Sequence, residues 1–520
     1  MEVYLCELTV NYHKSLNEKK LLIIALLFVV IGPNFAQRRN VIPTQADTLN
    51  NLNSFVLGMM AEWKIPATSI TIVKDGKPYY SSAYGLKNTV KNLPATVNTL
   101  FPIASCTKSF TAAALGILAD EGKLDWQKPI KEYMPDFQLF DEQATNTVTT
   151  RDILSHRTGL PRHDFVWLFN NNDRESIFKN MKYLKPSKTL YAQYQYNNLM
   201  YNVAGVLVER LSGKTWENFV REKILIPLEM KNTILTYPEL FKSPDYAMSY
   251  KLENERMVEA GFGSNVDAIG AAGAVKSNAV DMTNWLLMQL QNGQFNGKRI
   301  ISEKNLKENH TPLQVVYPTE AKYPELGFSS YGMGWNMNVY RGNQRRQHNG
   351  SIEGFRSQMT VFPNNNLGIF ITTNTGAVDY NFVNVITNYI SDNLLNMNQI
   401  DWNSRYHKEV SDNTFEEEKK KKEHNVNRKM GAMMSHPIDY YAGIYEHPAY
   451  GLLQIFKTDR GLRATYHNRQ TDLTHFHYDY FEGNDFLEGV TFNFLTNLKG
   501  DIDKIVATFP NAGEVEFKRK

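Results

Sequence analysis

A run of eight charged residues, 416–423, divides the chain into two parts of very different length. The run reads Glu-Glu-Glu-Lys-Lys-Lys-Lys-Glu and has no apolar face, so it is most simply a solvated linker helix. Because the composition changes near residue 400, we take residues 401–436 as a linker. The chain is therefore expected to hold two domains, residues 37–400 and residues 437–520.

The larger region carries both helical and strand-like patterns. Apolar residues recur at helical spacing over 46–63 and again over 382–395, and the long middle stretch is mostly helical and rich in loops. Strand patterns occur near both ends of the region, at 69–73, 78–82, 358–362 and 367–372, and Asp75-Gly76 predicts a hairpin between the first two. This arrangement predicts an α/β protein of the α+β type, with an antiparallel sheet flanked by helices and a helical subdomain.

The smaller region has no comparable helical pattern. It contains short strand-like runs separated by turns rich in Gly and Asn or Asp, at 452–456, 462–466, 492–495 and 505–509. These runs predict a small all-β module.

Charge and cysteine content exclude several kinds of partner. The chain has 57 Lys and Arg against 54 Asp and Glu, a net charge of +3, which disfavours a nucleic-acid partner. Its two cysteines, Cys6 and Cys106, build neither a disulfide in the exported chain nor a cysteine zinc site. The spacing of His467, His475 and His477 only loosely suggests a metal, so we expect no metal and no cofactor.

The N-terminal residues 1–36 have the pattern of an export signal. Lys19 and Lys20 precede twelve apolar or small residues, 21–32, and Ala36 supplies a small residue at the exit. The apolar run is shorter than the roughly 20 residues that a membrane helix needs. We therefore expect a periplasmic or secreted protein without a stable membrane span.

Ser105 and Lys108 form the first catalytic candidate. They are three residues apart and begin the helical pattern that continues to a stop at Gly122, so both side chains fall on one helix face. An amine so placed can take the hydroxyl proton, and the N-terminus of a helix favours a developing oxyanion. The neighbouring Cys106 points about 100° away around the helix, and we interpret it as a small packed residue.

Two later motifs add polar groups at places suited to a cleft. Tyr196 and Asn198 stand where a loop enters an apolar helical pattern. His348, Gly350 and Ser351 precede the strand pattern near residue 359, which is the position of an edge strand. Either motif alone is weak, and a second Ser-x-x-Lys at 176–179 is interpreted as a chance surface pair.

The order Ser-x-x-Lys, Tyr-x-Asn, basic residue-x-Gly resembles the serine β-lactamases and penicillin-binding proteins, specifically the class C β-lactamase-related branch. The resemblance covers about residues 46–398 and extends to further phrases at 121–125, 151–161, 227–230, 281–285 and 331–335. The region from residue 438 onwards resembles the small β-barrel-like module often appended to such proteins.

The resemblance implies a role for each motif. Ser105 would be the acylated nucleophile and Lys108 its base, with Tyr196 shuttling protons to the leaving group. Asn198 would orient the substrate amide and Lys108, and the backbone N–H groups of Ser105 and Ser351 would hold the oxyanion. The phrase at 151–161 contains His156, which we expect to be a structural histidine bonded to the backbone.

His348 stands where β-lactamases have lysine. A histidine has an ordinary pKa of about 6.5 and lacks the fixed charge that suits a β-lactam carboxylate. The sequence therefore predicts a cofactor-free serine hydrolase that acts on a small ester, peptide or amide, as esterases, D-aminopeptidases and D,D-peptidases do. The alternative is a penicillin-binding protein that recognises cell-wall peptide with slow or no turnover. The C-terminal module could cap the cleft, restrict substrate length or mediate homo-oligomer formation.

Overall fold

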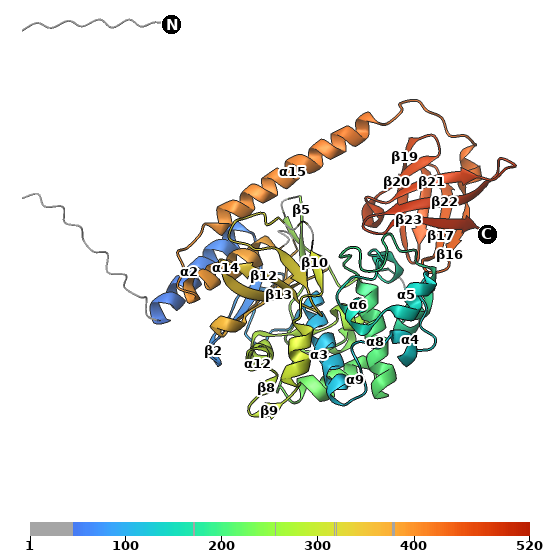
Figure 1. Ribbon diagram of the computed structural model, residues 1–520. Helices are drawn as coiled ribbons and strands as arrows, with labels where there is room; N and C mark the ends of the chain where they lie inside the picture. The colour runs from blue at the N-terminus through green and yellow to red at the C-terminus, as the bar shows by residue number, and fades with distance from the viewer. Residues whose placement is uncertain (1–44, 170–171, 255, 317, 319, 377–379) are drawn as a thin grey trace, which may run out of the picture. The chain divides into compact units, whose positions relative to one another are not determined.

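The computed structural model describes residues 45–520 apart from 170–171, 255, 317, 319 and 377–379 (Figure 1). The predicted export signal, residues 1–36, lies outside the described residues. Within the described part of the chain, no helix has both the length and the apolar character of a membrane span.

A nine-stranded antiparallel sheet organises the larger region. Its strand order is β10-β11-β12-β13-β14-β15-β1-β2-β3, so strands from the start and the end of the region are neighbours. The strands are β1 (Ala67–Lys74), β2 (Lys77–Asn88), β3 (Leu93–Pro94), β10 (Gln314–Val316), β11 (Ser329–Tyr331), β12 (Asn336–Tyr340), β13 (Asn343–Ile352), β14 (Phe355–Phe362) and β15 (Leu367–Thr373). The predicted sheet and its flanking helices are confirmed.

The predicted hairpin at Asp75-Gly76 joins β1 to β2. Both residues have positive φ, 52° and 74°, which is the backbone of a type I′ turn and matches the twist of the two strands. On its other side β1 pairs with β15, with Thr71 opposite Phe370. The hairpin therefore sets the register between β1 and β2.

Alternate residues of β15 face two separate cores. Ile369 and Ile371 pack with α2 (Gln45–Glu62) and α14 (Asn381–Leu394), whereas Phe370 belongs to the core that includes α12 (Ala279–Leu290). α2 and α14 lie side by side, with ring centroids of Phe55 and Tyr389 3.8 Å apart (Figure 1). Helices thus cover both faces of the sheet.

The middle of the chain forms the helical subdomain. Its longest helices are α3 (Thr107–Asp120) and α8 (Asn198–Ser212), which pack against each other and bury most of their residues. The shorter helices are α4 (Ile130–Tyr133), α5 (Glu142–Thr147), α6 (Thr150–Leu154), α7 (Arg174–Asn180), α9 (Trp216–Val220), α10 (Tyr237–Leu240), α11 (Gly270–Gly273) and α13 (Glu303–Asn309). Short strand pairs are β4–β7 (Phe101–Pro102, Lys276–Ser277), β5–β6 (Tyr250–Glu253, Arg256–Glu259) and β8–β9 (Gln294–Phe295, Lys298–Arg299).

The charge run lies in the long helix α15 (Trp402–Val426). Trp402 at its start is buried against Tyr340, and its indole N–H donates to the tyrosine hydroxyl at 3.1 Å. Residues 416–423 are all exposed, as their lack of an apolar face predicts.

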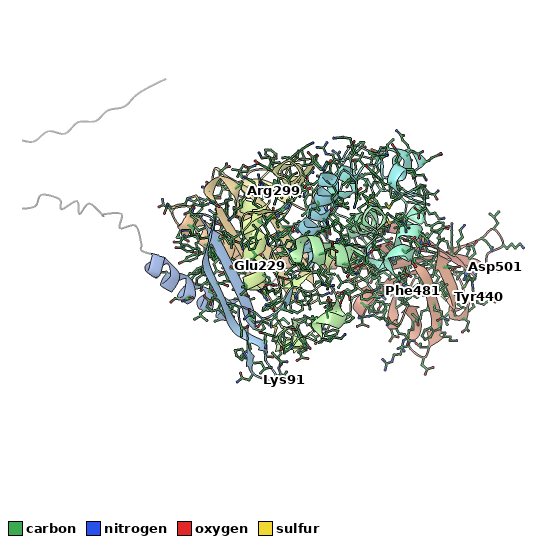
Figure 2. The ribbon with its side chains drawn as sticks, turned by 90° about the horizontal axis from the view of Figure 1, so that it is seen from below. Lys91, Glu229, Arg299, Tyr440, Phe481 and Asp501 are labelled. Atoms are coloured by element: carbon green, nitrogen blue, oxygen red, sulfur yellow. The ribbon has the colours of Figure 1, made fainter. Side chains whose placement is uncertain are left out.

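The C-terminal module is a closed barrel of eight antiparallel strands, which confirms the all-β prediction. The strands are β16 (Gly443–His447), β17 (Gly451–Thr458), β18 (Gly461–Tyr466), β19 (Arg469–His477), β20 (Tyr480–Gly483), β21 (Thr491–Thr496), β22 (Ile502–Phe509) and β23 (Gly513–Arg519). Aromatic residues fill it: Phe481 is buried at 2% exposure whereas the nearby Tyr440 is 53% exposed (Figure 2).

One loop of the helical subdomain contacts the barrel directly. The Phe165 carbonyl accepts from the Tyr466 hydroxyl at 2.9 Å, and the Phe165 ring lies 4.9 Å from that of Phe509. His163 Nδ1 is 2.7 Å from the Tyr450 hydroxyl. The barrel therefore holds the loop at residues 162–166, which carries two charged groups of the site described next.

Candidate active site

Ser105 lies in a tight turn immediately before α3. Residues Ala104–Cys106 form one turn of 3-10 helix, and Ala104 has φ of 47°, a left-handed conformation that is strained for alanine. Ser105 therefore precedes the α-helix, whereas the sequence predicts it within the first α-helical turn. Its relation to Lys108, which lies in α3, survives because residues three apart share a face in both 3-10 and α-helical turns.

Lys108 is fully buried and its amine has three partners. Nζ lies 3.1 Å from Ser105 Oγ, 2.8 Å from Asn198 Oδ1 and 2.9 Å from the Ala272 carbonyl oxygen. Burial, and secondarily the charge of Arg162, hold the Lys108 pKa well below its ordinary value. A neutral amine has two N–H groups and one lone pair. With the N–H groups donated to Asn198 and Ala272, the lone pair faces the Ser105 hydroxyl.

Tyr196 approaches the same two groups from the loop before α8. Lys108 Nζ lies 4.8 Å from its ring centroid, and the Ser105 hydroxyl is close enough to lower the Tyr196 pKa slightly. Burial raises the Tyr196 pKa above its ordinary value, so the phenol keeps its proton at neutral pH. Asn197 caps α8 by accepting from the Met200 N–H, which fixes where this loop enters the helix.

Asn198 is held from its other side by Asp164. Asn198 Nδ2 donates to Asp164 Oδ1 at 3.0 Å, and the indole N–H of Trp167 donates to the same oxygen at 2.9 Å. The second carboxylate oxygen of Asp164 pairs with Arg162. Sequence reasoning missed Asp164 and Arg162, and no motif marks them, because their roles depend on a contact with Asn198 34 positions later.

His348 is buried with its ring centroid 6.3 Å from that of Tyr196, and it is not among the described residues that line the Ser105 cleft. Nδ1 is 2.7 Å from the Asn349 carbonyl oxygen and therefore carries the proton, while Nε2 accepts from the Tyr331 hydroxyl at 2.7 Å. Burial lowers the His348 pKa to about 3, and the charge of Lys108 adds to this. His348 is thus neutral near pH 7, with both ring nitrogens already bonded inside the protein.

Gly350 and Ser351 lie in β13, which pairs with β12 and β14, so the predicted edge strand is wrong, and the two residues differ in exposure. A Cβ at Gly350 would stand 2.1 Å from the Ile103 carbonyl oxygen, so glycine lets β13 pass directly against the turn that carries Ser105. Ser351 is exposed and lines a cleft together with Ser105. Of this motif, Ser351 therefore shares the cleft with Ser105, and Gly350 allows close packing.

Two residues that could be mistaken for catalytic groups are packed inside. Cys106 is buried, with Sγ 3.2 Å from the His348 carbonyl oxygen, and burial raises its pKa to about 12. His156 Nδ1 accepts from the Asn197 N–H at 3.0 Å, and burial lowers the His156 pKa well below its ordinary value. Both predictions, a small packed cysteine and a structural histidine bonded to the backbone, are confirmed.

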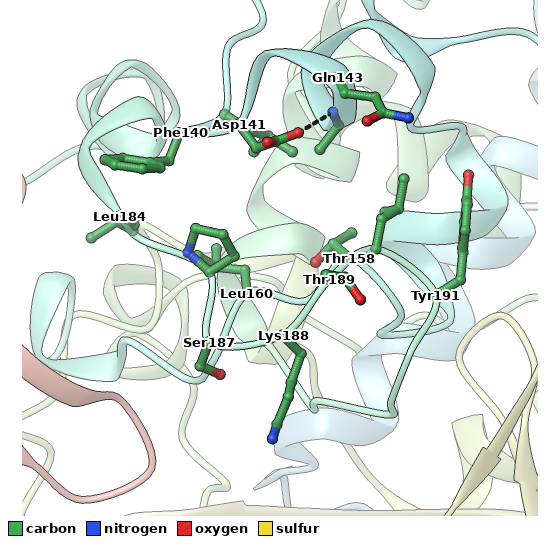
Figure 3. Close-up of a pocket in the computed structure, with 14 residues that line it drawn as sticks. Phe140, Asp141, Gln143, Thr158, Leu160, Leu184, Ser187, Lys188, Thr189 and Tyr191 are labelled. Atoms are coloured by element: carbon green, nitrogen blue, oxygen red, sulfur yellow. Dashed lines mark hydrogen bonds between the residues drawn. The ribbon is translucent and has the colours of Figure 1, made fainter.

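The cleft at Ser105 has a volume of about 420 Å³. Its charged lining residues are Arg162, Asp164, Lys251, Glu353 and Arg469. A separate cavity of about 540 Å³ lies in the helical subdomain beside Phe140, Leu160 and Tyr191 (Figure 3). Among the described residues, the lining of that second cavity includes none of the seven predicted site residues, and no group of three or more His, Cys, Asp or Glu is placed to hold a metal ion.

Comparison with known proteins agrees with this geometry. Residues 52–384 match the family model described as beta-lactamase. The chain belongs to the beta-lactamase family. Residues 427–519, which include the barrel, match a second model described as a domain of unknown function, DUF3471. The family resemblance stated from the sequence motifs is therefore confirmed.

Individual relatives within this family are distant. The chain is 30% identical to the unguisins hydrolase ungD' of Aspergillus campestris over 414 residues, which cover 76% of this chain and 75% of the relative. It is 26% identical to protein flp of Staphylococcus aureus strain MW2, over 64% of each chain. These relatives support a serine hydrolase at the level of the family.

Solved structures share the fold. The octameric penicillin-binding protein homologue from Pyrococcus abyssi aligns with a TM-score of 0.59 at 22% identity and covers 90% of this chain and 100% of its own. The structure of SurE with D-Leu aligns with a TM-score of 0.54 at 16% identity and covers 91% and 99%. The fold therefore extends over nearly the whole chain.

We predict that Asp164 acts as a positioning residue for Asn198 and Lys108. Replacing Asp164 by Ala removes the acceptor of Asn198 Nδ2, and we expect acylation of Ser105 to slow about 10- to 100-fold, the effect of losing a hydrogen bond to a charged group. Asp164→Asn should slow it less, because the new amide oxygen can still accept. Stopped-flow labelling with a serine-directed probe measures both.

A pH profile separates this role from a purely structural one. The Asp164 charge raises the Lys108 pKa. Removing it should therefore move the rising limb of the acylation profile to lower pH in Asp164→Asn. The control is Asp136→Asn, which removes an exposed ion pair with Arg210. An Asp164→Asn limb that coincides with the wild-type and control limbs would contradict the prediction.

Proposed function

We propose that the protein is a serine hydrolase of the class C β-lactamase-related branch that forms an acyl-serine on Ser105. The observation that carries the proposal is the buried amine of Lys108, which has two backbone or amide acceptors and lies 3.1 Å from the Ser105 hydroxyl. A neutral base in contact with a nucleophile, at the edge of a cleft, is the arrangement that acyl transfer requires.

The proposed reaction moves one proton through the three side chains. Ser105 Oγ attacks the substrate carbonyl carbon while its proton passes to Lys108 Nζ. The oxyanion is held by the N–H groups of Ser105 and Ser351. When the bond to the leaving group breaks, Tyr196 gives its proton to that group and takes one from Lys108. Water then cleaves the acyl-serine by the same steps in reverse. A Tyr196 pKa above the ordinary value favours this relay over a standing phenolate.

The substrate class is proposed as a small ester, peptide or other amide. His348 is buried and its ring nitrogens are bonded to Tyr331 and Asn349, so it offers no fixed charge to a β-lactam carboxylate. The fungal relative is named for hydrolysis of unguisins, and the structural neighbour SurE is described with D-Leu. The first name supports a hydrolase, and the second keeps D-residues among the candidate substrates.

We also propose that the chain is exported, on the strength of the apolar run 21–32 behind Lys19 and Lys20. Intact-mass measurement of the protein expressed in a bacterium should show a processed form that begins close to residue 37. Full-length protein retained in the cytosol would contradict this proposal.

Substitution of the pair tests the chemistry. We expect Ser105→Ala to abolish labelling by a serine-directed probe and Lys108→Ala to slow it about 10²- to 10⁴-fold, the usual contribution of a general base. Lys179→Ala is the matched control, because Lys179 is an exposed lysine three residues after Ser176. Labelling of Ser105→Ala at the wild-type rate would refute the nucleophile.

A substrate panel separates turnover from binding. p-Nitrophenyl esters, D-amino acid anilides and a chromogenic cephalosporin should show steady turnover on at least one of the first two classes. A burst of one equivalent without a steady state would instead favour a penicillin-binding protein that acylates and stops.

The pH dependence identifies the base. Because Lys108 must be neutral to accept the proton, acylation should rise with pH through the lowered Lys108 pKa and reach its plateau well below pH 10.5. His348, with a pKa of about 3, should contribute no limb above pH 5. We therefore expect the acylation rate of His348→Asn to rise over the same pH range as that of wild type, even if its plateau rate is lower. Disappearance of the limb in this variant would make His348 the base.

A further inference from the structure

Arg469 brings a charge from the barrel to the cleft of the catalytic region. It is the first residue of β19 and follows a turn in which His467 has φ of 53°. Arg469 lines the same cleft as Ser105 and Ser351. A residue more than 360 positions from the nucleophile therefore borders the space that a substrate would occupy.

The guanidinium is held in a defined place. Its Cζ lies 4.5 Å from the ring centroid of Phe169, a cation–π contact, and a terminal nitrogen would stand 2.9 Å from a Cβ built on Gly263. Glycine at 263 thus makes room for the guanidinium. Stacking on Phe169 covers one face of the planar group and leaves N–H groups on its edge, which suits bidentate binding of an oxyanion.

The other charged groups of the cleft are occupied within the protein. Arg162 pairs with Asp164, and Lys251 pairs with Glu253 at 2.5 Å. Glu353 accepts from the Ser264 N–H at 2.8 Å and from the Tyr237 hydroxyl at 2.9 Å.

Arg469 differs from the other charged residues of the cleft, which are Arg162, Asp164, Lys251 and Glu353. Among the described residues it has no carboxylate within ion-pair distance, and it is half-buried, so its charge is only partly screened by water. A half-buried cation that lines the Ser105 cleft and has no carboxylate partner in the described part of the chain is arranged for an anionic ligand.

We propose that Arg469 binds a carboxylate of the substrate, so that the preferred acyl donors are esters or amides that carry a free carboxylate. This inference rests on the proposed function, because it assigns a substrate class to the same Ser105 cleft. The barrel then takes part in substrate selection by supplying the charge that His348 does not.

Three otherwise similar esters test the proposal. p-Nitrophenyl butyrate is neutral, p-nitrophenyl hemiglutarate carries a carboxylate on the acyl side, and 3-carboxy-4-nitrophenyl butyrate carries one on the leaving group. We expect Arg469→Gln to lower kcat/KM about 10- to 100-fold for at least one anionic ester, chiefly through KM, and less than about twofold for the neutral ester. Arg469→Lys should retain part of the preference, and added salt should weaken it.

Arg463→Gln is the matched control, because Arg463 belongs to β18 and pairs with Asp472 at 2.5 Å outside the cleft. It should leave the preference among the three esters unchanged. Equal losses on neutral and anionic esters in Arg469→Gln, or no loss on either anionic ester, would overturn the proposal.

Failure of the proposed function gives a different result. If wild type turns over none of the esters and Ser105 resists labelling, calorimetry with glutarate and glutaramide still tests the carboxylate site. Glutarate should bind wild type in preference to glutaramide and lose this preference in Arg469→Gln, and equal binding of the two by wild type would overturn the site. If Arg469→Gln does not fold, binding of glutarate and glutaramide is measured on wild type and on Arg469→Lys at low and high salt. A preference for glutarate that weakens with salt and in Arg469→Lys would support the proposal, and equal binding of the two ligands would overturn it.

Discussion

The buried amine of Lys108 is the constraint on which the site depends. Moving an unpaired ammonium out of water costs several kcal/mol, so the neutral form is favoured and each of its bonds must be supplied by the protein. α8 supplies Asn198, α11 supplies the Ala272 carbonyl, and the turn before α3 supplies Ser105. Three elements that are distant in the sequence must therefore meet at one nitrogen atom. The packing of the helical subdomain holds them together there.

Sequence reasoning succeeded where the controlling interaction is local. The three-residue spacing of Ser105 and Lys108, the left-handed pair Asp75-Gly76 and the short β runs of the C-terminal module each specify a structure within a few residues. The order of the three motifs along the chain then indicated the family. The family in turn implies the sheet topology, which the spacing of apolar residues does not determine.

The other features of the site could not be predicted from the sequence, because they depend on contacts between distant segments. Asp164 becomes important only through Asn198, and Gly350 only through the Ile103 carbonyl, 247 positions earlier. His348 looks like a substrate-facing basic residue in the sequence. In the structure Tyr331 and Asn349 occupy its two nitrogens, and burial keeps it neutral. The lack of a fixed charge at His348 is thus predictable from the sequence, whereas its burial and its two partners are not.

The contact between the loop at 162–166 and the barrel means that two parts of the chain contribute to the site. In the proposed function, the groups that handle protons lie on the turn before α3, in α3 itself and in the loop before α8. Packing against this turn is close, because a Cβ at Gly350 would stand 2.1 Å from the Ile103 carbonyl oxygen. The lining of the cleft also includes Arg469 of the barrel, whose buried aromatic residues belong to the same hydrophobic cluster as the helical subdomain. Arg469 follows a turn at the barrel surface and not a buried helix. If it binds substrate as proposed, changes in this turn would alter substrate preference and leave the contact between Ser105 and Lys108 in place.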